Sequence, residues 1–534
     1  MVKYTDVLIV GAGPSGLMMA AELLRYGIQP MVVDAKPGPD RRSKAMLVHA
    51  RAMELFRQLG LSDPLLAKGP SFYAMQLLGH RGTIGTMDFS QLADTDTVFP
   101  FMQQVRQDEV ERQLLQRLTE RACPVAWETR LDDVKLDDNG ATVTLVRGGK
   151  HHDWRCGWVV GADGGRSTLR RLLDIRQEGT GREQAFFEAE VEAEQVDSRK
   201  IRIVFHENGP LAAIPYRVSN RHRIIGRLPE AYGVGKGSGL AYADVKAEVE
   251  AALGVGPGAD RFSHIGRFNY QAAVAEQVHR QRCFLIGDAA HGVSPLVSRG
   301  MNEGLSDAVN LSWKLAGVVN GRMAPRVLHT YGQERLPAVK KGDGIFGAAE
   351  GTPPWPGWLA DMRLRRRVGR ITTTAGRLRQ TFERLSGLDV DYRQSPLSVH
   401  HSSGWQVVAG DRLPCLPVFD EKSKTQTDLH RWCEKPGFVL LVLGTVAHHH
   451  LNIIGQWIRQ KYPREMHLYY LPYSDRNQAV FDAFEVKPNN TKIILIRPDM
   501  HIGYINDMLN VSLIDTYKEE ILGWDYFGHL PEKR

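Results

Sequence analysis

The sequence has little cysteine, no long hydrophobic run and a small net charge. Its five cysteines are odd in number, widely spaced and form no C-x-x-C motif, which argues against a disulfide framework, a zinc site and a dithiol redox pair. The longest apolar run, residues 438–443, is far too short to span a membrane. The formal charge of +7 is scattered along the chain and is weak evidence for a nucleic-acid partner. We therefore expect a cytoplasmic protein that binds no nucleic acid, no membrane and no metal.

The composition is that of a globular protein. Apolar residues make up 43% and charged residues 24% of the chain, and 52 glycines and 27 prolines are spread along it, which excludes collagen-like and disordered classes. A chain of 534 residues has room for about three domains, or for one large discontinuous domain with an appendage.

A dinucleotide-binding fingerprint opens the chain. It consists, in order, of an apolar strand, a Gly-x-Gly-x-x-Gly turn, a helix and a second strand that ends in an acid: residues 7–10, 11–16, 17–26, 31–33 and Asp34. Gly11 permits the tight turn, Gly13 lets a pyrophosphate approach the backbone, and Gly16 lets the helix pack on the strand. The acid accepts hydrogen bonds from free ribose hydroxyls, so the pattern predicts FAD or NAD. The residues that we predict to bind the dinucleotide here are Gly11, Ala12, Gly13, Pro14, Ser15, Gly16 and Asp34.

Periodicity predicts the elements that follow. A helix is expected over 107–121, a hairpin over 134–146, a strand over 158–160, an antiparallel sheet over 186–227, a strand over 284–286 and a helix over 302–319. After about residue 395, three strands (438–443, 466–471 and 491–496) and a helix (453–462) indicate a small α/β unit.

Three motifs in a fixed order, 11–16, 161–170 and 287–291, resemble the signature set of the group A flavoprotein aromatic hydroxylases, the para-hydroxybenzoate hydroxylase-like monooxygenases. The resemblance covers residues 1 to about 395. It includes Ser43-Lys44-Ala45 with Arg51-x-x-Glu54, where Lys44 stands in the place of a usual arginine, and also Gln107-x-x-x-Glu111 and Tyr331-x-x-Glu334-Arg335-x-Pro337. The C-terminal unit looks like the thioredoxin-like extension of the phenol-hydroxylase branch.

The resemblance implies an α/β fold with three parts. A Rossmann-like FAD-binding domain would comprise 1–71, 106–178 and 277–345, and an antiparallel-sheet substrate domain would comprise 72–105 and 179–276. A helical connection over 346–394 would lead to the thioredoxin-like domain, 395–534. Because this last domain lacks C-x-x-C, a structural or oligomerisation role, as in a homodimer, is expected, and the domain is expected to be dispensable for the chemistry.

The resemblance also implies further cofactor-binding residues. Asp288, at the end of a buried strand, can accept the ribityl hydroxyls of FAD, whereas an unpaired carboxylate in a core would be costly. The amides that open the helix after Asp288 can face the flavin and stabilise the negative charge of the reduced form. The cofactor-binding residues predicted in this way are Lys44, Gln107, Asp163, Gly164, Asp288, Pro295, Gly300, Met301 and Asn302.

The loop before this helix departs from the family pattern. Arg299 occupies the place of a Gln or Lys, so Pro295 and Arg299 are predicted to influence catalysis, with Arg299 adding a positive charge near the flavin. The alternative is that Arg299 points away and pairs with a surface carboxylate. His291 and residues 448–450 lack metal-ligand spacing and are interpreted as packing or surface histidines.

The function implied by the resemblance is FAD-dependent monooxygenation. NADH or NADPH would act as a transient reductant, and O₂ would react through a C4a-hydroperoxyflavin to hydroxylate a small aromatic substrate, phenolic or polyketide-like. Substrate-facing candidates are His206, Tyr216, Arg217 and Tyr270. The alternatives are a flavin-dependent halogenase, whose Trp-x-Trp-x-Ile-Pro element is not matched by residues 355–358, and a non-catalytic flavin-binding protein.

Overall fold

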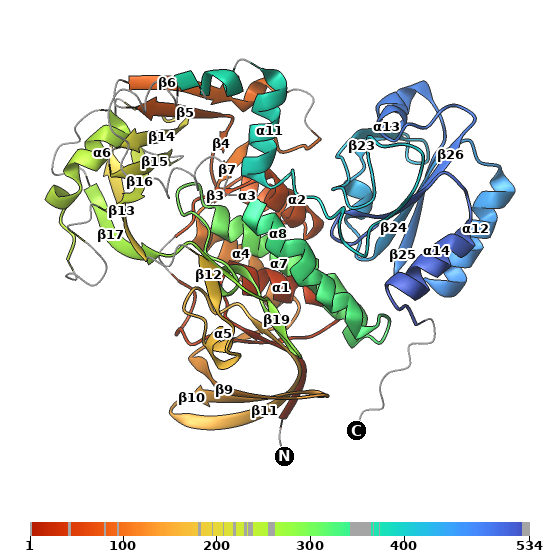
Figure 1. The fold of residues 1–534 in the computed structure, drawn as a ribbon, viewed down its shortest axis with the longest axis horizontal. Helices are drawn as coiled ribbons and strands as arrows, with labels where there is room; N and C mark the ends of the chain where they lie inside the picture. Colours follow the sequence, from red (N-terminus) through yellow and green to blue (C-terminus); the bar gives the residue numbers. More distant parts are fainter. Residues whose placement is uncertain are drawn as a thin grey trace.

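The computed structural model describes most of the chain, in three regions that lie side by side (Figure 1). The described residues are 3–40, 44–79, 82–92, 96–179, 183–194, 196–206, 208–216, 220–228, 232, 239–254, 262–341, 365–366, 368–372 and 374–525. Within them no helix is both long and apolar enough to cross a membrane, and no group of three metal-ligating side chains is placed to hold an ion.

The first region is built on a mainly parallel sheet, in the strand order β19-β20-β11-β1-β2-β8. The strands are β1 (Lys3–Val10), β2 (Met31–Val33), β8 (Val125–Ala126), β11 (Lys150–Gly161), β19 (His279–Arg280) and β20 (Cys283–Leu285). β1 pairs in parallel with β2 and β11, and β11 pairs in parallel with β20. The antiparallel hairpin of β9 (Thr129–Asp137) and β10 (Gly140–Arg147) extends this sheet from β11. The expected Rossmann-like arrangement is therefore present.

Helices cover this sheet, and α1 and α7 pack closely against each other. The helices are α1 (Pro14–Arg25), α2 (Ala50–Gln58), α3 (Ser62–Leu66), α4 (Gln107–Glu120), α5 (Thr168–Leu172), α7 (Arg299–Val319) and α8 (Thr330–Lys341). α7 packs against the first turn of α1 at Gly304, where a Cβ atom would lie 2.2 Å from Ser15 Oγ. The absence of a side chain at Gly304 therefore lets the N-terminal part of α7 lie next to the glycine loop, residues 11–16. A short three-stranded sheet, β3 (Leu47–Val48), β7 (Met102–Gln104) and β4 (Ser71–Phe72), lies beside these helices.

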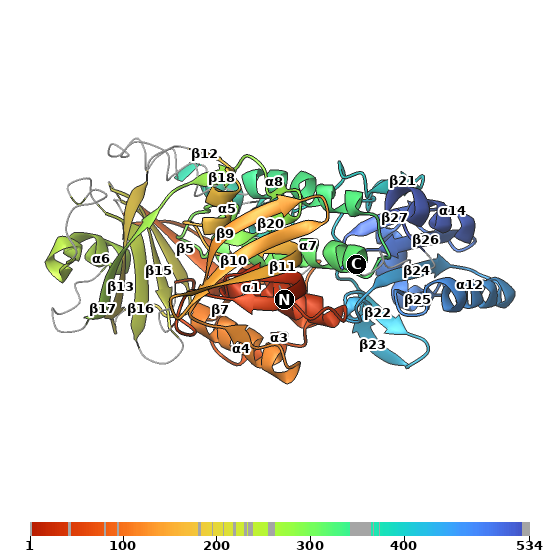
Figure 2. The ribbon, with the colours of Figure 1, turned by 90° about the horizontal axis from the view of Figure 1, so that it is seen from below.

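The second region is a seven-stranded sheet, in the order β17-β13-β16-β15-β14-β5-β6. The strands are β5 (Ala74–Gly79), β6 (Gly82–Asp88), β13 (Gln184–Glu192), β14 (Ile201–His206), β15 (Gly209–Pro215), β16 (Arg221–Arg227) and β17 (Phe262–Tyr270). α6 (Lys246–Leu253) packs on one face with Phe187, Ala189 and Val191 of β13. Figure 2 shows the sheet standing between α6 and the first region, so the alternate side chains of each strand face the first region. The strands β12 (Gln177–Gly179) and β18 (Ala273–Ala275) connect the two regions.

The third region is a five-stranded sheet, in the order β21-β27-β26-β24-β25. Its elements are β21 (Val399–His401), β24 (Phe438–Gly444), α12 (His448–Lys461), β25 (Met466–Leu471), α13 (Gln478–Ala483), β26 (Thr491–Ile496), β27 (Ile502–Asn506) and α14 (Val511–Thr516), with the hairpin β22 (Pro417–Asp420) and β23 (Thr425–Asp428). α11 (Ala375–Ser386) precedes it in the chain. The α/β character is as expected, while thioredoxin-like topology and the domain boundaries stay predictions.

Candidate cofactor and substrate site

The glycine loop between β1 and α1 is closely packed on one side and open on the other. A Cβ on Gly11, whose φ is +108°, would lie 2.2 Å from the carbonyl oxygen of Ala162, and a Cβ on Gly16 would lie 1.9 Å from the carbonyl oxygen of Gly11. Both positions therefore require glycine for packing. At Gly13 a Cβ would meet nothing within 4 Å. The open face of the loop is thus the one at which the sequence places a pyrophosphate.

Asp34 lies at the carboxyl end of β2, next to this loop. Its Oδ2 accepts a hydrogen bond from Ala12 N at 2.7 Å, and its Oδ1 accepts one from Lys36 N at 2.8 Å. A carboxylate oxygen has two lone pairs, so each oxygen can accept a further bond from a ribose hydroxyl.

Asp163 of the second motif has a structural role that the sequence does not reveal. Its carboxylate accepts hydrogen bonds from Ser167 Oγ and from the backbone amides of Thr168 and Leu169, so it caps α5. At Gly164, with φ of +79°, a Cβ would meet nothing within 4 Å. The cofactor-binding roles of Asp163 and Gly164 stay predictions.

A buried arginine joins the second motif to the third. Arg170 donates from Nη1 to the carbonyl oxygen of Ala289 at 2.8 Å and from Nη2 to that of Gly165 at 2.7 Å. Residues that are widely separated in the sequence are thereby held in one loop cluster.

Asp288 lies in the short helix η4 (Gly287–Ala289), at the carboxyl end of β20. Its side chain is exposed, yet desolvation by the surrounding protein raises its pKa, and the charges of His291 and Lys44 oppose this rise. A Cβ on Gly300 would lie 3.6 Å from Asp288 Oδ1, so the carboxylate lies beside the first turn of α7. An accessible carboxylate at a desolvated position is an acceptor for the hydroxyl groups of a ligand.

Asp307 of α7 positions this loop. It accepts hydrogen bonds from the backbone amide of Gly287 at 2.9 Å and from His291 Nε2 at 2.6 Å. Burial favours its protonated form, but His291 and Arg335 outweigh burial and lower the pKa of Asp307 to about 2. For His291, burial favours the neutral form, and the Asp307 carboxylate raises its pKa in spite of this. The interpretation of His291 as a packing residue therefore becomes more specific: it is part of a buried ion pair.

Gln107 and Asn302 both hold the segment 45–49. Gln107 Oε1 accepts a hydrogen bond from Ala45 N at 3.2 Å, and Asn302 Oδ1 accepts one from His49 N at 2.8 Å. Asn302 Nδ2 donates to the carbonyl oxygens of Leu47 and Ser298. The segment that begins with the exposed Lys44 is thus fixed from both sides beside the third motif.

The charge of Arg299 is paired in the structure. Its Nε and Nη2 donate to Glu303 Oε1 at 3.0 and 2.8 Å, and Glu303 Oε2 accepts from Arg335 at 2.7 Å. The sequence predicts either an unpaired positive charge of Arg299 beside the flavin or a pair between Arg299 and a surface carboxylate. The partner is instead a buried carboxylate, because the loop turns Arg299 onto the helix face that carries Glu303 one turn later. Catalytic roles for Pro295, at the start of the loop, and for Arg299 stay predictions.

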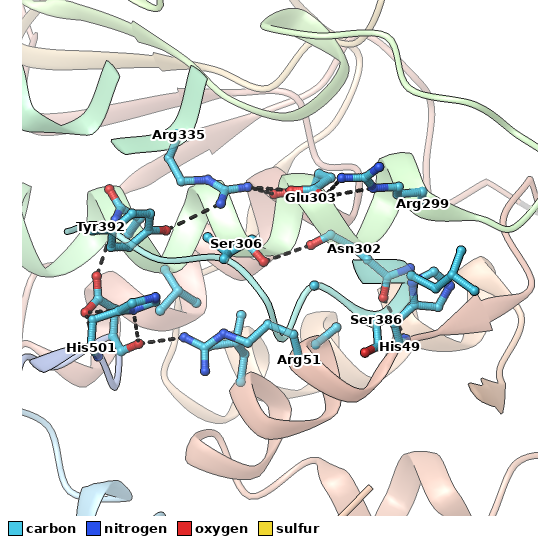
Figure 3. A pocket seen from close by; sticks show the side chains of 18 residues that line it. His49, Arg51, Arg299, Asn302, Glu303, Ser306, Arg335, Ser386, Tyr392 and His501 are labelled. Carbon is cyan, nitrogen blue, oxygen red and sulfur yellow. Dashed lines mark hydrogen bonds and ion pairs between the residues drawn. The ribbon is translucent and has the colours of Figure 1, made fainter. Parts of the chain in front are cut away.

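A pocket that the sequence does not indicate lies along this face of α7 (Figure 3). Arg299, Glu303 and Arg335 form a row along one side of it, and His49, Arg51 and His501 lie on the other. It is lined by α2, by residues 385–392 and by residues 499 and 501 of the third region. It lies away from the α7 face that packs on Ser15, and so it is separate from the glycine loop.

Three of the four substrate candidates lie among the described residues, on or next to the seven-stranded sheet. His206 ends β14, where its Nδ1 accepts a bond from Asn208 N at 3.5 Å. Tyr216 donates a hydrogen bond to Glu190, and Tyr270 packs edge-on against Phe186 at 5.8 Å. Tyr216 and Tyr270 belong to the face turned toward the first region. Arg217 lies outside the described residues.

Comparison with known proteins identifies the family. Residues 4–342 match the family model described as FAD binding domain. The chain is 31% identical over 464 residues to the 12-dehydrotetracycline 5-monooxygenase/anhydrotetracycline 6-monooxygenase of Streptomyces rimosus, which covers 82% of this chain and 85% of that protein. The chain belongs to the FAD-binding family of flavoprotein aromatic hydroxylases.

Two further similarities extend this result. The flavoprotein is 32% identical over 339 residues to the 6-methylpretetramide 4-monooxygenase of Streptomyces rimosus, an alignment that covers 62% of this chain and 59% of that protein, less than two thirds of its length. The OxyS anhydrotetracycline hydroxylase of Streptomyces rimosus has the same fold, with a TM-score of 0.77, 25% identity and coverage of 97% of this chain and 99% of that one.

The residues of the flavoprotein fit FAD. Open space at Gly13, acceptor positions on Asp34 and the accessible carboxylate of Asp288 lie along one path from the glycine loop to the start of α7. These groups match the pyrophosphate, the adenosine ribose and the ribityl chain, respectively.

Sequence reasoning missed two sets of residues. Asp307 lies within the predicted helix, and nothing in the periodicity of that helix indicates that its carboxylate binds Gly287. The carboxylates Glu188 and Glu190 do leave a signal, because they alternate with Phe187, Ala189 and Val191 in an otherwise apolar strand.

Proposed function

We propose that this flavoprotein is an NAD(P)H- and FAD-dependent monooxygenase that hydroxylates a phenolic or polyketide-like aromatic ring. The observation that carries the proposal is that Asp34 binds Ala12 of the glycine loop while Gly287, next to Asp288, and Gly304 of α7 pack against Ser15 of the same loop, in a chain of the aromatic hydroxylase family. When bound, FAD supplies the redox and oxygen-activating chemistry.

The residues of the chain would bind, orient and protect. Asp34 would accept the ribose hydroxyls, Asp288 the ribityl hydroxyls, and the first amides of α7 would face the pyrimidine edge of the flavin, where negative charge develops. Asp307 would act as a positioning residue through Gly287 and His291. The apolar parts of the seven-stranded sheet would exclude water from the reacting ring.

The polyketide-like substrate class is supported by the relatives. Those reported above are named as monooxygenases or hydroxylases of 6-methylpretetramide, 12-dehydrotetracycline and anhydrotetracycline. None of these three is named a halogenase, so the halogenase alternative has no support among them.

Consumption of NADH and NADPH by the purified protein tests the function, across a panel of phenols and fused-ring polyphenols. We expect at least one ring compound to stimulate consumption and to gain one oxygen atom by mass. A protein that retains FAD, but whose NAD(P)H oxidation no ring compound stimulates, would instead be the non-catalytic flavin-binding protein.

A further inference from the structure

A compact polar cluster lies on the seven-stranded sheet, on the face turned away from α6. Its members are Glu188, Glu190, Tyr216, Arg223 and His264. In the strand register, Glu190 is paired with Arg223 on one side and with His264 on the other. Ala189 and Val191 pack toward α6. Because side chains alternate along a strand, Glu188 and Glu190 point to the opposite face.

The cluster is held together by charge. Arg223, with only 2% of its side chain exposed, donates to Glu188 and lies 3.9 Å from Glu190. Tyr216 donates to Glu190, and His264 Nε2 lies 3.3 Å from Glu188 Oε1. The carboxylates nevertheless stay 17% and 22% exposed. Among the described residues of the cluster, two carboxylates thus face a single guanidinium, so the carboxylates outnumber the arginine that pairs with them.

The cluster lies near the segment that borders the cofactor site. The Tyr216 and Glu190 groups are close enough to Arg106 to raise its pKa, after the larger effects of Asp108 and burial. Arg106 is itself paired with Asp108 at 2.9 Å and directly precedes Gln107, which holds Ala45. Aromatic rings lie on the same face beside the cluster: Phe186 stacks on Phe268 and contacts Tyr270 edge-on.

From this geometry we infer that the cluster selects the substrate: it favours an uncharged aromatic ring with several hydroxyl groups and rejects a ring that carries a carboxylate. The inference rests on the proposed function and narrows its substrate class. The hydroxyl groups of the substrate can donate to the accessible oxygens of Glu188 and Glu190. The aromatic side chains beside these glutamates would contact the apolar faces of the substrate ring. A ring carboxylate would meet like charge where solvent screens it only partly.

A matched pair of ligands tests the inference. Calorimetry on the FAD-loaded protein measures the dissociation constants of a dihydroxyanthraquinone and of its carboxylic acid. We expect the uncharged compound to bind at least about tenfold more tightly. Glu190→Gln keeps the size and the hydrogen bond to Tyr216 but removes one charge, so the preference should fall about tenfold, chiefly through tighter binding of the acid.

Two further variants separate charge from structure. Glu192→Gln makes the same change two residues along β13, at an exposed pair with Arg221, and should leave the preference unchanged. Tyr216→Phe keeps the charge and should weaken both ligands equally. The inference is overturned if the acid binds as tightly as the neutral ring, or if Glu190→Gln leaves the ratio unaltered.

The oxygenation assay separates this inference from the proposed function. If the protein hydroxylates carboxylated rings in preference to neutral ones, the function stands and the inference is wrong. If neither ligand binds and no ring stimulates NAD(P)H consumption, both are overturned together.

Discussion

Glu334 of α8 and Arg497, which follows β26, form a two-pronged ion pair across the boundary between the first and third regions. The distances are 2.7 and 2.8 Å, and neither side chain is exposed. Burial favours the protonated carboxyl, but Arg497 and Lys314 outweigh burial and lower the pKa of Glu334. Arg497 also binds Asp499, which accepts a hydrogen bond from Trp313 of α7. The third region is therefore joined to the helix that begins at the cofactor site.

Breaking this pair should destabilise the whole protein. Glu334→Gln leaves Lys314 buried without its carboxylate partner and Arg497 with Asp499 alone, and we expect a loss of about 3–5 kcal/mol in the free energy of unfolding. Denaturant titration measures it. Glu120→Gln, which removes an exposed pair with Arg117, is the control and should cost less than about 1 kcal/mol. Equal effects of the two variants would contradict this account.

The same contacts bear on the expected dispensability of residues 395–534. Arg412 pairs with the buried Glu54, and Gln58 donates to the carbonyl oxygens of Cys433 and Pro498. A chain cut near residue 395 would remove Arg412 from Glu54 and Arg497 from Glu334, so each carboxylate would keep only one of its cationic partners, Arg51 or Lys314. The sequence predicts only that this unit is dispensable for the chemistry, not that it is dispensable for assembly or solubility. From these contacts we expect the truncated protein to be insoluble. Expression with a solubility assay tests this, and a soluble truncated protein would contradict it.

Local patterns predicted much of the fold, because they depend on neighbouring residues. The helix expected over 107–121 is α4, the hairpin expected over 134–146 is β9 with β10, and the strands of the C-terminal unit fall where alternation and apolar runs place them. Partners across the fold left no such pattern. Asn302 accepts a hydrogen bond from the backbone of a segment far away in the sequence, a contact that becomes visible only in the fold. The cap that Asp163 forms on α5 and the pair of Arg299 with Glu303 are local, but several local partners were available to each side chain and the sequence does not say which one it takes.

Asp288→Ala should weaken the retention of FAD. The variant removes an accessible carboxylate that would accept the ribityl hydroxyls, and the loss of such charge-assisted bonds costs about 1.5–3 kcal/mol, or about 10- to 100-fold in affinity. The ratio of flavin absorbance to protein after dialysis measures it. Asp132→Ala, on the exposed hairpin, should keep its flavin. A yellow Asp288→Ala protein with unchanged affinity would remove this residue from the cofactor site.

Gly304→Ala should be destabilising even though alanine favours helices. The new Cβ would lie 2.2 Å from Ser15 Oγ and 3.0 Å from Gly287 Cα, so α7 must move away from α1 and the third motif, at a cost of about 1–3 kcal/mol. FAD affinity should fall in parallel. Gly455→Ala in α12 meets only the end of Arg459 at 3.8 Å and should stabilise by about 0.5–1 kcal/mol. Thermal unfolding of both variants provides the comparison, and a stabilised Gly304→Ala protein would refute the close contact.

Acid should destabilise the protein through two buried histidines. Burial lowers the pKa of His49 and of His430 to about 4, from 6.5 in the unfolded chain. The unfolded state therefore binds more protons below pH 6.5, and stability should fall between about pH 6.5 and 4 by up to about 1.4 kcal/mol per pH unit for each group. In His430→Gln, which can still donate to the Leu413 carbonyl, the acid slope should decrease by one proton. Unfolding titrations at several pH values check this, and an unchanged slope would show that His430 does not contribute.

Arg299→Gln tests what the loop before α7 does to the flavin. An isolated charge near the ring would raise the flavin potential, so its removal would slow reduction by NADPH. A charge held at 2.8 Å by Glu303 acts instead as part of a dipole, and its field falls off more steeply with distance. We therefore expect the reduction rate to stay within about twofold of the wild-type rate.

The free energy of unfolding of Arg299→Gln should decrease by about 1–3 kcal/mol, because Glu303 would lose one of its two cationic partners. Arg299→Lys, which keeps the charge, is the control for both measurements. Stopped-flow reduction with a redox titration decides the matter: a lowered potential and a slow reduction in Arg299→Gln alone would return this arginine to the catalytic role predicted from the sequence.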